Sequence, residues 1–132
     1  MRTMSKNTKP FSIKERIRSF GFAFKGFAHL FKTEHNAWIH LFVTLLVILF
    51  GVWLAISKFE WLLIVLCIGF VFTSEIFNTA IEHLGDAISE EQNELIGKAK
   101  DLAAAGVLFS TFVAVFIGLV IFIPHLMTKF GL

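Results

Sequence analysis

The sequence contains little cysteine and proline, and these shortages exclude several kinds of structure. Its single cysteine, Cys67, lies inside an apolar run, so neither a disulfide nor a cysteine metal site can form within one chain. The two prolines stand near the two ends. Residues 1–10 are polar and basic and the first long apolar run begins near Ala37, so no secretory signal is expected. Without internal repeats or Gly/Ser linkers, residues 1–132 are expected to form a single domain.

Long hydrophobic runs are what the sequence has in excess. Hydrophobic residues make up 56% of the chain, against about 45–50% in soluble domains. The run at 37–56 contains no Asp, Glu, Lys or Arg and is long enough to cross a bilayer. After a polar turn at 57–60, two more runs have membrane-spanning length, 61–82 and 101–123, and Pro124 is expected to end the last. The sequence therefore predicts an all-α integral membrane protein with three transmembrane helices.

The segment before the first crossing has the pattern of an amphipathic helix. After a flexible tail at 1–10, Ser12 and Glu15 match a capping box and predict a helix over 12–33. Its apolar residues recur at spacings of three and four: Ile13, Ile17, Phe20, Phe24, Phe27 and Phe31. Cations occupy an adjoining face: Lys14, Arg18, Lys25 and Lys32. We expect this helix to lie on the membrane surface, because the following segments leave no soluble core for it to pack on.

Lysine and arginine are unevenly distributed about the crossings. Eight precede the first crossing, and Lys98 and Lys100 precede the third, whereas the opposite side carries only Lys58 and Lys129. This excess predicts that the N-terminus and the segment before the third crossing face the cytoplasm. The short external turn leaves no room for a site on the other side, so the chemistry is expected at the cytoplasmic surface.

A stripe of acidic and polar residues follows the second apolar run. Read as a continuing helix, it places Glu75, Asn78 or Thr79, Glu82 and Asp86 on one face. Carboxylates at the edge of the hydrocarbon are costly, and such acids are functional-site candidates by default. Glu75 is the deepest, and we interpret it as a general base. The alternative is a structural carboxylate that is hydrogen-bonded to Asn78 or to a neighbouring helix.

Other charged residues have the chemistry to hold a cation and an anion. Glu82 and Asp86, one turn apart, could bind Mg²⁺, and Glu34 at the same membrane level could add an oxygen ligand. A lysine at Lys100, near a helix start, is favoured if an anion such as a nucleotide phosphate sits there. Asp101 has the simpler interpretation of a helix cap. Because the sequence has no P-loop and no protein-kinase Gly-rich loop, nucleotide chemistry must use carboxylates, a metal and a lysine.

Two classes of protein fit these residues. One is a membrane enzyme that acts on a lipid at the cytoplasmic surface, and the other is a small oligomeric transporter in which Glu75 carries a proton. Three crossings per chain are few, so both versions require an oligomer. Glu34, Glu82 and Asp86 favour the enzyme, since a proton carrier needs only the deeply placed Glu75.

One ordered set of residues resembles a known family. The run Glu75-Ile-Phe-Asn78-Thr-Ala-Ile-Glu82, then Asp86, then Ala99-Lys100-Asp101-Leu-Ala-Ala-Ala is similar to the prokaryotic diacylglycerol kinases, which include the undecaprenol kinases. The resemblance extends through the N-terminal helix, with Ser19-Phe-x-x-Ala-x-Lys25-Gly26, and through all three crossings. It implies a homotrimer in the bacterial inner membrane with sites shared between subunits. It also implies transfer of the γ-phosphate of MgATP to a lipid hydroxyl, with no nucleic-acid partner.

The resemblance also implies roles for individual residues. Glu75 would be the catalytic base, with Asn78 as its positioning partner, and Asp86 becomes a supporting acid rather than a ligand. Glu34 and Glu82 would hold Mg²⁺. The implied nucleotide-binding set is Phe22, Glu34, Glu82, Glu91, Gln92, Asn93, Lys100 and Asp101.

The chain departs from the family pattern at two positions. Where relatives place an arginine near the nucleotide and lipid, this chain has Glu15 followed by Arg16, and Arg16 is expected at the lipid site. Phe22 stands where some relatives have a tyrosine beside the adenine, and it cannot donate a hydrogen bond. The segment Glu34-His-Asn36-x-x-Ile39-His40 resembles the undecaprenol kinases, so undecaprenol is favoured over diacylglycerol.

Overall fold

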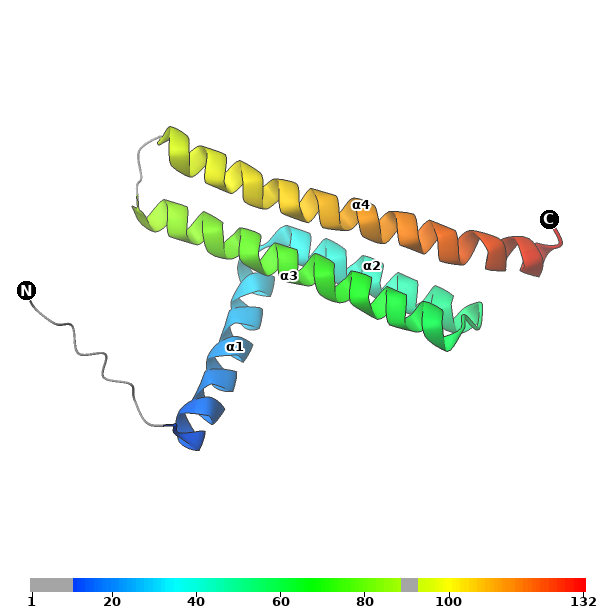
Figure 1. The fold of residues 1–132 in the computed structure, drawn as a ribbon, viewed down its shortest axis with the longest axis horizontal. Coiled ribbons are helices and arrows are strands. Elements are labelled where there is room, and N and C mark those ends of the chain that lie inside the picture. The colour runs from blue at the N-terminus through cyan, green and yellow to red at the C-terminus, as the bar shows by residue number, and fades with distance from the viewer. Residues whose placement is uncertain (1–10, 89–92) are drawn as a thin grey trace, which may run out of the picture.

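The computed structural model describes residues 11–88 and 93–132. These residues form four helices: α1 (Ile13–Thr33), α2 (His35–Trp53), α3 (Lys58–Ile88) and α4 (Glu94–Phe130). In Figure 1, α2, α3 and α4 run side by side with alternating direction, and α1 leaves this bundle at a steep angle. The all-helical prediction is confirmed.

The starts of α1 and α3 are fixed by side-chain caps. The Ser12 hydroxyl accepts a hydrogen bond from the backbone N–H of Glu15, as the capping pattern predicts. Before α3, the backbone N–H of Ser57 donates to the Glu60 carboxylate at 2.7 Å, and the N–H of Glu60 donates to the Ser57 hydroxyl at 3.3 Å. This reciprocal capping box makes 57–60 the beginning of α3 rather than a separate polar turn.

The last helix is longer than its apolar run. Asn93 caps α4, since its side-chain oxygen accepts from the backbone N–H groups of Leu95 and Ile96. Asp101 therefore lies two turns inside the helix, so its interpretation as a cap is wrong. The helix also continues through Pro124, which does not end it, and stops only at Gly131, where φ is 68°.

A close approach of Trp61 to Gly51 closes the hairpin between α2 and α3. A Cβ atom on Gly51 would lie 2.7 Å from the Trp61 indole, so only glycine fits there without a shift. The chain then turns at Ala55, whose φ is 52°. Beneath the turn lies a cluster of buried apolar residues: Leu54, Ile56, Ile64 and Ile121. The glycine and this cluster hold one end of the bundle together.

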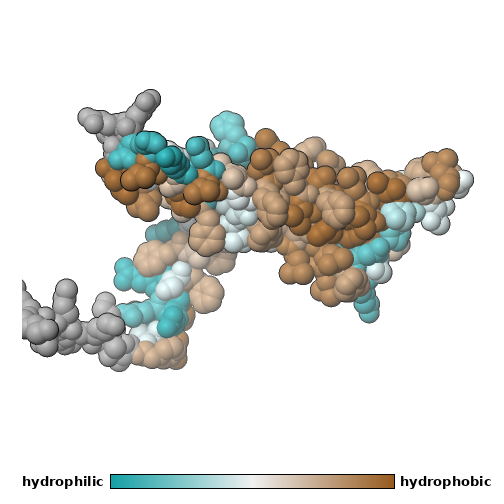
Figure 2. Space-filling model, turned by 45° about the horizontal axis from the view of Figure 1, so that its top comes forward, coloured by the Kyte–Doolittle hydropathy of each residue, from teal (hydrophilic) through white to brown (hydrophobic). Residues whose placement is uncertain are grey.

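Most of the apolar surface of the bundle is not covered by the chain itself. Side chains such as Leu66, Phe109 and Phe116 are about two-thirds exposed. Figure 2 shows hydrophobic residues over the middle of the bundle and hydrophilic residues gathered toward its ends and on α1. Three helices, α2, α3 and α4, are long and apolar enough to cross a membrane, as the apolar runs predict.

The Gly51–Trp61 contact leads to a first prediction. We expect Gly51→Ala to destabilise the protein by about 1–3 kcal/mol, because the indole must move out of a packed hairpin. The matched control is Gly69→Ala, where a Cβ meets no atom within 4 Å and where the better helix propensity of alanine adds up to about 1 kcal/mol of stability. Thermal unfolding of the purified proteins in detergent measures both. Equal midpoints for the two variants would contradict this account of the hairpin.

Candidate functional site

The buried carboxylate of Glu75 is the centre of the site. Glu75 is only 1% exposed, although it is an acid on a helix with large apolar side chains. Among the described residues, neither of its carboxylate oxygens has a hydrogen-bond partner. The nearest basic group is His40 of α2, whose Nε2 lies 3.8 Å from Glu75 Oε2. A buried acid with unused acceptors is costly to fold and is free to accept a proton or a hydrogen bond from another molecule.

The next turns of α3 carry a second polar layer. Asn78 and Thr79 are buried at 7% and 5% exposure, one turn beyond Glu75. The Asn78 side-chain amide donates to Glu82 Oε1 at 3.2 Å, a spacing of one helical turn. This bond orients the Glu82 carboxylate, while the carbonyl oxygen of Asn78 and the hydroxyl of Thr79 have no partner in the described chain. The predicted stripe on one face of α3 is therefore present.

The corner between α1 and α2 brings Glu34 to the same place. Glu34 is the residue between the two helices, in an extended conformation. The indole N–H of Trp38 donates to the backbone carbonyl of Phe31 at 2.7 Å, and Phe31 also packs on Phe72 of α3. These contacts fix the corner against α3. Glu34 at this corner and Glu82 on α3 both lie near enough to Glu75 for their charges to act on its carboxylate.

Asp86 and Lys100 join the polar ends of α3 and α4. The Lys100 ammonium donates to Asp86 Oδ1 at 2.5 Å. The lysine stem reaches across Gly85, where a Cβ would lie 2.8 Å from Lys100 Cε and 2.9 Å from Ile96 Cγ2. Glycine thus lets α4 approach α3 closely enough for the pair to form. Because Asp86 is paired with Lys100, its position suits the role of a supporting acid better than that of a metal ligand.

The carboxylates do not form a closed metal cage within the described part of the chain. Among the residues that the structure describes, no set of three His, Cys, Asp or Glu side chains could hold a metal ion by itself. Mg²⁺ usually takes one or two protein carboxylates and completes its shell with water and substrate phosphates. Glu34 and Glu82 can supply those two carboxylates.

Several predicted residues are not brought to Glu75 within one chain. Arg16 lies in the first turn of α1, at the end that projects from the bundle in Figure 1. Its guanidinium stands over the Phe11 ring. Phe22 is exposed and contacts Arg18 and Lys25 of its own helix.

The predicted nucleotide residues past α3 also lie apart from Glu75 or outside the described chain. Asn93 serves as a helix cap, and Asp101 is exposed on α4. Glu91 and Gln92 lie outside the described residues.

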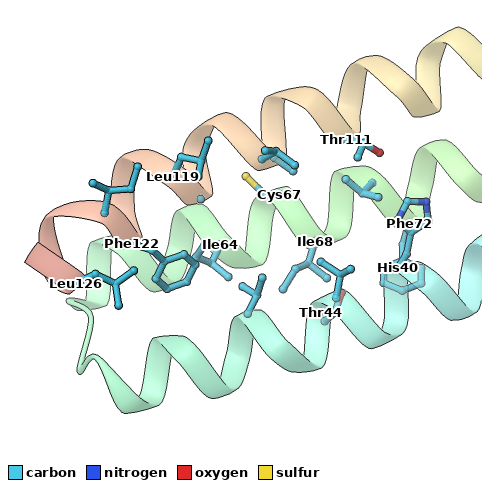
Figure 3. Close-up of a pocket in the computed structure, with 17 residues that line it drawn as sticks. His40, Thr44, Ile64, Cys67, Ile68, Phe72, Thr111, Leu119, Phe122 and Leu126 are labelled. Carbon is cyan, nitrogen blue, oxygen red and sulfur yellow. The ribbon is translucent and has the colours of Figure 1, made fainter.

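The side chains around Glu75, namely Glu34, Asn78, Thr79 and Glu82, are called the polar cluster below. An apolar groove runs from this cluster along the bundle, and the sequence did not predict it. Side chains from α2, α3 and α4 enclose a volume of about 300 Å³. In Figure 3, His40 and Phe72 stand at one end, Leu126 at the other, and Cys67 between them. His40 also faces Glu75, so the groove begins beside the buried carboxylate. No sequence pattern could reveal this, because it depends on the register between helices that the loops set.

The chain is similar in sequence to proteins of the following family. The family model described as prokaryotic diacylglycerol kinase matches residues 21–122. An undecaprenol kinase of Bacillus subtilis (strain 168) is 38% identical over 110 residues, which cover 83% of this chain and 89% of the relative. A diacylglycerol kinase of Escherichia coli (strain K12) is 32% identical over 112 residues, covering 85% and 90%. A diacylglycerol kinase of Synechocystis is 32% identical over 111 residues, covering 83% and 63%.

Proposed function

The chain belongs to the prokaryotic diacylglycerol kinase family, and from this premise we propose that it phosphorylates undecaprenol at the cytoplasmic face of a bacterial inner membrane. It is a membrane lipid kinase, a phosphotransferase that uses ATP as the phosphoryl donor. The observation that carries the proposal is the position of Glu75. Its buried carboxylate lies where an apolar groove meets a polar cluster.

The length of α3 supports this placement at the membrane boundary. At 1.5 Å per residue, Glu75 lies about 26 Å along the helix from Lys58, and the hydrocarbon core of a bilayer is about 30 Å thick. Glu82 and Asp86 then lie beyond the core, at headgroup level. A lipid alcohol has its hydroxyl at the depth of Glu75, and a nucleotide reaches the same level from the water. The excess of Lys and Arg on this side supports a cytoplasmic orientation.

Each residue of the cluster has a separate role in the proposed reaction. Glu75 accepts the proton of the lipid hydroxyl, which becomes the attacking oxygen. Asn78 orients Glu82, and Glu34 and Glu82 would hold Mg²⁺. When bound, the ion neutralises charge on the phosphate oxygens of ATP. Lys100, held by Asp86 until the nucleotide arrives, contributes a second positive charge to those phosphates.

The groove and the relatives together favour a polyprenol. A long isoprenoid tail needs an apolar path that starts beside the reacting hydroxyl, and the groove from His40 to Leu126 provides one. The undecaprenol kinase relative is 38% identical and the Escherichia coli diacylglycerol kinase 32%. Diacylglycerol, with two acyl chains, is the alternative substrate.

An oligomer would complete the site. The exposed apolar faces of α2, α3 and α4 leave surface for lipid and for neighbouring subunits. The remaining members of the predicted set, Arg16, Phe22, Asn93 and Asp101, do not converge on Glu75 within one chain, so a trimer with shared sites is the proposed assembly. In it, α1 lies on the membrane surface with its aromatic residues in the lipid boundary.

The role of Glu75 is tested with Glu75→Gln. We expect a loss of at least about 10²-fold in ATP-dependent phosphorylation of undecaprenol, because the amide cannot accept the proton. Glu94→Gln is the matched control, since Glu94 is 82% exposed and, among the described residues, pairs with Lys98 alone. The assay uses reconstituted protein, labelled ATP and either undecaprenol or diacylglycerol. Full activity in Glu75→Gln would refute the base assignment, and labelling of diacylglycerol alone would refute the choice of lipid.

The metal role of Glu82 is tested with Glu82→Ala. Removal of one of two carboxylates should raise the Mg²⁺ concentration needed for half-maximal activity, and high Mg²⁺ should restore part of the rate. Titration of activity with Mg²⁺ at saturating lipid measures this. A variant with a reduced rate but an unchanged Mg²⁺ requirement would rule out the assigned role.

The groove is tested by filling it. Ala114→Phe should raise KM for undecaprenol several-fold while leaving a short-chain prenol almost unaffected, because only the long tail occupies the groove. Val120→Phe is the control, since Val120 is exposed on the same helix and does not line the groove. If Ala114→Phe weakens both alcohols equally, the tail lies elsewhere.

A further inference from the structure

Two histidines outside the polar cluster, one on α1 and one on α3, face each other. The Nε2 atoms of His29 and His83 are 3.2 Å apart. The ring centroids are 5.0 Å apart and the ring planes are inclined by 49°. Both side chains are exposed to solvent. The function proposed above uses neither of them.

This geometry matches two ligands of one tetrahedral metal ion. Nitrogens bound at 2.0–2.1 Å to Zn²⁺ lie about 3.3 Å from each other in a tetrahedral shell. If both ring lone pairs point at the metal, the ring centroids lie about 5 Å apart by the same geometry. Both distances between His29 and His83 agree with these values.

A direct hydrogen bond between the rings explains the distances less well. Such a bond is strongest when the N–H of one ring points straight at the nitrogen of the other. Rings aligned in this way at the observed nitrogen separation would have centroids about 5.5 Å apart. The observed separation is 5.0 Å, so the two rings are not aligned along the line that joins their nitrogens.

We propose that His29 and His83 form a binding site for a zinc-class transition-metal ion that ties α1 to α3. Imidazole nitrogen suits Zn²⁺, Cu²⁺ and Ni²⁺, whereas Mg²⁺ takes oxygen ligands. The site is therefore chemically distinct from the carboxylates Glu34 and Glu82. Because no third protein ligand stands close enough among the described residues, water completes the shell and the site is open to solvent.

The position of the pair gives the metal a mechanical role. α1 meets the bundle near its C-terminal end, where Leu30 is buried, and its other end projects away (Figure 1). His29 is the residue before Leu30, and His83 follows Glu82 on α3. A metal bound by both histidines would hold α1 against the helix that carries the polar cluster. The bound ion therefore reduces the motion of α1 relative to α3.

Metal binding is tested directly by calorimetric titration of Zn²⁺ into the purified full chain, without ATP or lipid. We expect one ion per chain, and a loss of affinity of about tenfold or more in His29→Ala and in His83→Ala. The control is His35→Ala, since His35 is an exposed histidine at the start of α2 that lies outside the pair. His83→Cys keeps a zinc ligand and should retain binding. Equal affinity in all variants would overturn the site.

Two further measurements distinguish this site from the polar cluster around Glu75. Glu82→Gln, or millimolar Mg²⁺, should leave Zn²⁺ binding unchanged, and a loss of binding in either case would place the ion at the carboxylates instead. Hydrogen exchange should slow in the last turns of α1 when Zn²⁺ is added to the wild type, and not in His83→Ala. If Zn²⁺ binds through both histidines without slowing exchange, the proposed tie between the helices is wrong. None of these results depends on kinase activity.

Discussion

The burial of the Glu75 carboxylate is the constraint on which the rest of the structure depends. An acid with 1% exposure and no hydrogen-bond partner in the described chain destabilises the folded protein. Glu75 is buried because α2 packs against α3 at this level, and His40 of α2 lies beside its carboxylate. The polar groups that follow, Asn78 and Glu82, are joined by a hydrogen bond and continue the polar face of α3 beyond the buried acid. Because its acceptors are unused in the described chain, Glu75 is better explained by the proposed role, in which it receives a group from outside the chain, than by that of a structural carboxylate.

Close helix approach at glycine positions builds both ends of this arrangement. At one end Gly51 admits the Trp61 indole and closes the hairpin over an apolar cluster. At the other end Gly85 admits the stem of Lys100, which then reaches Asp86. Between the two ends, the helices separate enough to leave the groove of about 300 Å³. The same bundle thus has a closely packed apolar end, an apolar groove in the middle and a polar end.

Much of the fold follows from the sequence because the membrane permits few alternatives. Uncharged runs of membrane-spanning length must be helical, since backbone groups in lipid can be satisfied only within the chain. The Ser12–Glu15 cap was readable from local spacing. Pro124 misled the prediction, because a membrane helix can continue past a proline when neighbouring groups satisfy the freed carbonyl. The predicted polar turn at 57–60 was misplaced, because Ser57 and Glu60 cap the start of α3 and the chain turns just before this helix, at 54–57.

The sequence predicted the part of the candidate site that lies on α3, and it placed Glu34 at the same membrane level. Spacing alone placed Glu75, Asn78, Glu82 and Asp86 on a common face of α3. The contacts of His40 with Glu75, and of Lys100 with Asp86, depend on the register between helices. The most direct test of the account is a solid-state NMR distance between the labelled carboxyl carbon of Glu75 and the labelled hydroxyl-bearing carbon of bound undecaprenol. We expect the two groups to lie within hydrogen-bond reach, and a polyprenol bound with its hydroxyl away from Glu75 would contradict the account.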